Sequence, residues 1–373
     1  MKIKFLGALA FAATAALTAL AQGPYTVPIY VDTPSNFSPD RYTIYASMTG
    51  GNSTTSAIVP YLFDTGAPNM FSTLGGAGHS VTDSFTFAQG LSYNYYMDPV
   101  TVTLGDNLGN PLASTGAGVN VASVVSITSG GNTTFTSNNM LADNTYGDFG
   151  AGLYGTSTLA TILTQLPLGP GLQAGYLVNV AGVVSGNGTL TIGLSSAAIT
   201  AAENAPGAII MPLSLSGNLI PTTSGNFING YNKAQVANAT VSLTNPIASN
   251  TTPLVLDTGG GPNSVIYSTA FGADSSGTRA LTLSYNGSTI LAYPGTTPYG
   301  GNVVIANDIS GGTRINPGGA AIYDNYEVMF LLPTGSTLGE VVLIPAPVPE
   351  PATFALLASG VAGLLSLFRR RRS

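Results

Sequence analysis

The chain contains no cysteine and no tryptophan, and His79 is its single histidine. The absence of cysteine excludes disulfide scaffolds, iron–sulfur clusters, cysteine nucleophiles and thiolate zinc sites. A single histidine excludes the H-E-x-x-H metalloprotease motif, and no P-loop motif is present for nucleotide phosphates. The sequence therefore predicts neither a metal nor another cofactor.

Charged residues are also scarce, at 7% of 373 residues. Six of the ten basic residues and one of the sixteen acidic residues lie in the two terminal segments, so residues 22–346 contain four basic and fifteen acidic residues. A nucleic-acid-binding surface needs clustered basic residues to neutralise phosphates. We therefore expect no nucleic acid partner. The apolar content of 44% is high enough for a folded core.

Residues 1–21 have the order of a secretory signal peptide. Lys2 and Lys4 precede an apolar run, and Ala19, Leu20 and Ala21 form a small-residue cleavage site. We expect signal peptidase to remove this segment during export.

The opposite end, residues 347–373, has three consecutive parts. Pro349, Glu350 and Pro351 are followed by the uncharged residues 352–368 and then by four arginines at positions 369–372. Seventeen helical residues span about 25 Å, enough to cross a bilayer without tilt, and the arginines would remain on the cytoplasmic side. The pattern predicts a transmembrane helix that transiently anchors the chain in the inner membrane.

This tail resembles the PEP-CTERM sorting signal in the order of its three parts. The resemblance implies a Gram-negative bacterium that makes exopolysaccharide. It also implies an exosortase that cuts near Pro349, Glu350 and Pro351 and delivers the protein to the cell envelope or the extracellular matrix.

Between the terminal segments, short runs rich in Val, Ile, Thr and Tyr alternate with Gly, Asn, Pro and Ser, which is typical of an all-β fold with few short helices. The strands we expect include residues 42–48, 100–104, 119–127, 190–192, 241–243, 281–285 and 340–344. The best helical candidate is 159–166, with Ser157 and Thr158 as caps. A lobe boundary near 201–207 predicts one β lobe over 22–202 and a second over 203–346.

One motif occurs twice. Asp64, Thr65 and Gly66 follow three apolar residues, and Asp257, Thr258 and Gly259 do the same 193 positions later. Each triplet precedes a Pro-Asn pair, although the composition predicts only about 0.2 copies of Asp-Thr-Gly per chain.

Two copies at this spacing can meet across a pseudo-twofold axis and bring two carboxyl groups together. We expect the glycines to provide backbone angles barred to other residues, and the threonine hydroxyls to bond the opposite loop. Two carboxylates this close cannot both ionise, so they share one proton. A water held between them is activated to attack an amide carbonyl.

With these triplets, the sequence resembles the pepsin-like aspartic proteases, which have two β lobes related by a pseudo-twofold axis. Three further stretches resemble the family in order, namely residues 148–153, residues 186–193, and residues 325–330 followed by 339–342. The resemblance implies that Asp64 and Asp257 are the catalytic pair, supported by Thr65, Gly66, Thr258 and Gly259.

The sequence departs from the family at the site. Ala67 and Gly260 stand where a hydroxyl normally follows each triplet, so we expect both carboxylates to lack an outer donor and to hold the shared proton to higher pH. Phe87 stands where the family has a flap tyrosine, and a shifted flap would instead use one of three nearby hydroxyls. Those candidates are Tyr93, Tyr95 and Tyr96.

Two functions fit these observations. The favoured hypothesis is an exported aspartic endopeptidase that hydrolyses peptide or protein substrates. The alternative is a surface or biofilm-matrix protein with the same fold and little or no activity, which binds exopolysaccharide or peptide.

Overall fold

The computed structural model describes residues 24–32, 41–52, 55–87, 90–136, 139–155, 159–181, 186–222, 227–244, 247–261, 263–297, 301–307, 312–318, 321–332 and 339–346. The predicted signal peptide and the predicted tail lie outside these residues. Within them, no helix has the length and hydropathy needed to cross a membrane.

The strands form two hydrogen-bonded sheets that share β13 (Ile209–Pro221). The first sheet contains β1 (Tyr25–Asp32), β2 (Arg41–Thr49), β3 (Thr55–Asp64), β4 (Met70–Ser72), β5 (Asp83–Thr86), β6 (Leu91–Gly105), β7 (Pro111–Ser114), β8 (Val119–Ser129), β9 (Asn132–Thr136), β10 (Gly147–Gly150), β11 (Leu172–Asn179), β12 (Gly186–Ser195), β22 (Tyr326–Leu331) and β23 (Glu340–Pro345). The second contains β14 (Phe227–Thr244), β15 (Ile247–Leu254), β16 (Ser264–Tyr267), β17 (Ser275–Gly277), β18 (Leu281–Tyr285), β19 (Ser288–Tyr293), β20 (Val303–Ala306) and β21 (Arg314–Asn316).

All seven strands expected from the sequence are confirmed. The helix expected over 159–166 is wrong in extent, because only Ile162–Gln165 is helical, as the 3₁₀ turn η1, and its cap is Thr161. The longer helix α1 (Ser196–Glu203), capped by Ser195, was not predicted. The predicted lobe boundary after residue 202 falls in the last turn of α1.

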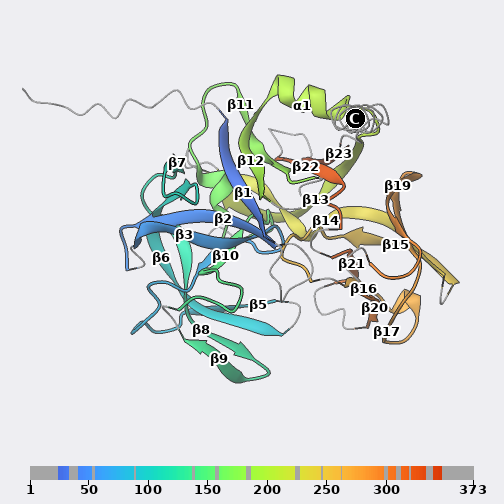
Figure 1. The fold of residues 1–373 in the computed structure, drawn as a ribbon, viewed down its shortest axis with the longest axis horizontal. Helices are drawn as coiled ribbons and strands as arrows, with labels where there is room; N and C mark the ends of the chain where they lie inside the picture. Colours follow the sequence, from blue (N-terminus) through green and yellow to red (C-terminus); the bar gives the residue numbers. More distant parts are fainter. Residues whose placement is uncertain are drawn as a thin grey trace, which may run out of the picture.

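A shared set of strands joins the two halves of the chain. Its order is β1, β12, β11, β22, β23 and β13, with every neighbouring pair antiparallel. The order is symmetric about its centre. In the first half β1, β12 and β11 are the first, last and second-last strands, and β13, β23 and β22 have the same places in the second half. Figure 1 shows these strands between β2, β3, β6 and β8 on one side and β15, β16 and β20 on the other.

The duplication extends to the strands around each Asp-Thr-Gly triplet. In the first half β3 pairs parallel with β10, β10 antiparallel with β4, and β4 parallel with β8. In the second half β15, β21, β16 and β20 repeat this order and these directions. The predicted all-β architecture of two lobes related by a pseudo-twofold axis is therefore confirmed.

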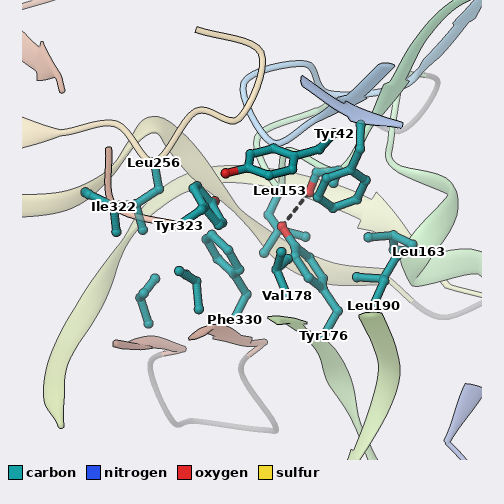
Figure 2. Close-up of a cluster of buried hydrophobic side chains, with 14 of the residues drawn as sticks. Tyr42, Leu153, Leu163, Tyr176, Val178, Leu190, Leu256, Ile322, Tyr323 and Phe330 are labelled. Carbon is teal, nitrogen blue, oxygen red and sulfur yellow. Dashed lines mark hydrogen bonds between the residues drawn. The ribbon is translucent and has the colours of Figure 1, made fainter. Parts of the chain in front are cut away.

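The core is continuous across the two halves. Tyr176 on β11 stacks against Phe330 on β22 with ring centroids 4.8 Å apart, and Tyr42 lies 6.2 Å from Tyr323. Figure 2 shows these rings in one apolar cluster with Leu256, beside the second triplet. Packing of this cluster therefore supports the loops that carry both aspartates.

We expect Phe330→Ala to lower the free energy of unfolding by about 3–5 kcal/mol, because the ring is buried and its removal leaves a cavity. Urea denaturation measures this loss. The control is Leu108→Ala, where the side chain is 82% exposed and the change should stay within about 0.5 kcal/mol. Equal stability of the two variants would contradict the shared core.

Candidate active site

The two triplets lie at the ends of equivalent strands and make the same local hydrogen bonds. Asp64 ends β3, and Asp257 lies three residues beyond the end of β15. The backbone N–H of Gly66 donates to Oδ1 of Asp64 at 2.6 Å, and that of Gly259 donates to Oδ1 of Asp257 at 2.9 Å. Each loop therefore orients its own carboxyl group.

Each carboxyl group packs against the glycine of the opposite triplet. A Cβ added to Gly66 would lie within 3.0 Å of the carboxyl carbon and both oxygens of Asp257, and one added to Gly259 would meet Asp64 in the same way. Neither glycine has a positive φ. The sequence-based reason for these glycines, unusual backbone angles, is therefore wrong: what the site requires is the close approach of the two loops.

Thr65 and Thr258 join the loops by reciprocal hydrogen bonds. The backbone N–H of each threonine donates to the hydroxyl of the other at 2.9 Å. The Thr65 hydroxyl donates to the carbonyl of Leu256, and the Thr258 hydroxyl to that of Phe63, both at 2.7 Å. Both threonines are buried, so these bonds hold the two aspartates in a fixed relation.

The outer oxygens of the two aspartates have different partners. Nδ2 of Asn316, on β21, donates to Oδ2 of Asp257 at 2.7 Å. The expectation that both carboxylates lack an outer donor is therefore wrong for Asp257, because an amide from another strand takes the place of the hydroxyl missing at Gly260.

The two carboxyl groups consequently differ in their surroundings. Burial, then the neighbouring Asp257 and then Asp148, raise the pKa of Asp64 well above its ordinary range. Asp257 is less buried than Asp64 and accepts two N–H donors. Asp64 is therefore the side chain of the pair that retains a proton above the ordinary range of an aspartate.

Two cavities adjoin the pair. The larger, of about 560 Å³, has mostly apolar walls and contains Asp148, and the smaller, of about 270 Å³, contains Asp257 and Asn316. Asp64, Phe87 and Gly259 line both, so the two cavities meet at the aspartates.

The flap candidates occupy different places. Phe87 follows β5 and is half-buried, and its N–H donates to the carbonyl of Leu91 at 2.8 Å across the hairpin. Tyr93 lines the larger cavity, as does Asp148. Tyr95 and Tyr96 line neither cavity, and Tyr96 donates to the carbonyl of Gly75 at 2.9 Å.

A third buried carboxyl group, Asp148, lies in the larger cavity. Burial and the nearby Asp143 raise the pKa of Asp148 to about 7. Asp143 itself pairs with Arg41 at 3.5 Å. Within the described residues, no group of three or more His, Asp or Glu side chains is placed to hold a metal ion.

The sequence analysis did not identify Asn316, although the duplication contains a signal for it. In the sheet, Asp148 on β10 pairs with Leu62 on β3 and with Phe71 on β4. Asn316 on β21 pairs with Val265 on β16, and the residue before it, Ile315, pairs with Leu254 on β15. Asp148 and Asn316 are therefore equivalent under the pseudo-twofold relation. Aligning the strands after the two triplets would have placed Asn316 beside Asp257.

Comparison with family models matches residues 347–372 to the PEP-CTERM protein-sorting motif, which implies export and processing by an exosortase. No curated protein matches the chain in sequence. Among solved structures, the chain is similar to the aspartic proteinase from Irpex lacteus, with 15% identity, 88% of this chain and 99% of that chain covered, and a TM-score of 0.48. It is also similar to Basic 7S globulin from soybean, with 11% identity, coverage of 87% and 97%, and a TM-score of 0.48.

We expect Thr258→Val to lower the free energy of unfolding by about 2–5 kcal/mol, because it leaves the buried N–H of Thr65 and the carbonyl of Phe63 without partners. Thr258→Ser keeps the hydroxyl and should cost less. Urea denaturation of both variants measures the difference, and a valine variant as stable as the serine variant would contradict the role of these bonds.

The raised pKa of Asp148 predicts a pH-dependent stability. The protonated carboxyl is fully stabilising below about pH 4, and this contribution is lost as the pH rises through about 7. The side chain introduced by Asp148→Asn cannot ionise. The free energy of unfolding of this variant should therefore change less between pH 4 and 8 than that of the wild type, and the two changes should differ by up to about 4 kcal/mol. Urea denaturation at several pH values in this range measures the difference, with Asp106→Asn in an exposed turn as the control. The same dependence of unfolding free energy on pH in the wild type and in Asp148→Asn would refute the prediction.

Proposed function

We propose that this chain is an exported aspartic endopeptidase that hydrolyses peptide bonds with a water activated by Asp64 and Asp257. The observation that carries the proposal is the reciprocal packing of each carboxyl group against the other triplet's glycine. The raised pKa of Asp64 supports a shared proton.

In this mechanism, Asp257 accepts a proton from the water as its oxygen attacks the amide carbon, and Asp64 donates its proton to the carbonyl oxygen. The resulting tetrahedral intermediate collapses when the amide nitrogen takes a proton from Asp257 and the C–N bond breaks, while one hydroxyl of the intermediate returns its proton to Asp64. Thr65, Gly66, Thr258 and Gly259 hold the two carboxyl groups in position, and Asn316 donates a hydrogen bond to Asp257.

The surroundings of the pair suit a peptide substrate. The two cavities adjoin the aspartates on opposite lobes, so an extended peptide can place successive side chains in them. Phe87 lines both cavities and can cover the bound peptide, but its ring donates no hydrogen bond. Among the three tyrosine candidates for the flap, only Tyr93 lines one of these two cavities, and it does so together with Asp148.

The terminal segments support export. We propose that signal peptidase removes residues 1–21, that residues 352–368 hold the chain in the inner membrane, and that an exosortase releases it to the envelope or extracellular matrix. An exopolysaccharide in that matrix is a further partner under this proposal.

The test is cleavage of a denatured protein mixture by the purified protein from acid to neutral pH, with and without a statine-type inhibitor. We expect inhibitor-sensitive cleavage, and a loss on the order of 10³-fold or more in Asp64→Asn and in Asp257→Asn. Asp106→Asn, in an exposed turn, should keep full activity. A wild-type protein inactive over the whole pH range would overturn the proposal and favour a binding protein with the same fold.

A further inference from the structure

Arg314 is a buried cation in the smaller cavity. The residue is 6% exposed, donates one hydrogen bond to the carbonyl of Gly312 at 2.6 Å, and has its guanidinium 4.0 Å from the ring centroid of Tyr267. It makes no ion pair with any carboxylate of the described residues. A buried guanidinium has five donors, and burial without an anion is unfavourable.

The strand geometry places this cation in the same cavity as the aspartates. Arg314 and Asn316 are two residues apart on β21, so their side chains lie on the same face of the strand, about 7 Å apart along it. Their partners on β16, Tyr267 and Val265, line the cavity with them. Asn316 contacts Asp257, and Arg314 lines the same cavity as both aspartates.

Because basic residues are scarce in this chain, the position of Arg314 in a cavity is informative. Residues 22–346 contain four basic residues, and two of them, Arg41 and Arg314, line the cavities beside the aspartates. Arg41 pairs with Asp143, whereas the smaller cavity contains no acidic residue besides the catalytic pair. The proton held by Asp64 limits that pair to one negative charge.

From this arrangement we propose that the smaller cavity binds a carboxylate of the substrate through Arg314. The inference rests on the proposed function, and it defines the substrate class as peptides that place a carboxylate next to the scissile bond. Two sources have this chemistry: the side chain of Glu or Asp, and a free C-terminus. Arg314 is a specificity-determining residue in this proposal, and it takes no part in proton transfer.

The experiment measures binding of fluorescent peptides to the Asp64→Asn protein, in which the substituted side chain resembles the protonated acid and prevents turnover. Peptide pairs differ only by Glu or Gln at one position, each with a free or an amidated C-terminus. We expect about tenfold tighter binding for the peptide with the carboxylate. A preference that depends on Glu identifies a side chain as the source, and one that depends on the free C-terminus identifies the terminus.

Adding Arg314→Gln should abolish this preference, while Arg279→Gln, outside both cavities, should keep it. If Arg314→Gln does not fold, Arg314→Lys should fold and retain a reduced preference, because lysine keeps the charge without the bidentate geometry. Equal binding of charged and uncharged peptides, a preference that survives Arg314→Gln, or no binding of any peptide would overturn the inference.

Wild-type hydrolysis of the same peptides separates this inference from the proposed function. A carboxylate preference without cleavage would refute the endopeptidase and keep the binding site. Cleavage without a carboxylate preference would refute the binding site and keep the endopeptidase.

Discussion

The reciprocal hydrogen bonds between Thr65 and Thr258 determine how the two halves of the chain meet. Each threonine uses its backbone N–H and its hydroxyl on the opposite loop, so neither loop has its buried polar groups satisfied alone. The close approach then leaves room only for glycine at positions 66 and 259. The six-stranded sheet shared by both halves and the core around Tyr176 and Phe330 hold the rest of each lobe in register with this contact.

Although the backbone is nearly symmetric, the site is not. The symmetry-equivalent positions 148 and 316 hold a carboxylic acid and an amide, and only the amide bonds one of the two paired aspartates. This difference in donors gives the two aspartates different surroundings while their loops remain alike. The two cavities also differ in chemistry, with Asp148 in the larger and Arg314 in the smaller.

Much of the fold and the central pair could be predicted because their signals are local or repeated. Short runs rich in Val, Ile, Thr and Tyr indicated the strands, and two Asp-Thr-Gly triplets with the same flanks indicated the pairing of Asp64 with Asp257. Arg314 could not be found in this way, since β21 carries no motif of its own, and Asn316 could be found only by aligning the strands that follow the two triplets. The helix predicted around Ile162–Gln165 was too long, because helix propensity does not record where tertiary contacts end a helix.

The central claim is that Asp64 and Asp257 form one pair that shares a proton, with the proton held by Asp64. Carbon-13 NMR of the aspartate carboxyl groups, titrated from acid to alkaline pH, tests it most directly. The account predicts a carboxyl signal, separate from the raised signal of Asp148, that stays protonated well above the ordinary aspartate range and disappears in Asp64→Asn. The signal of Asp257 should shift when Asp64 is replaced. Two signals that titrate independently near pH 4, as isolated aspartates do, would contradict it.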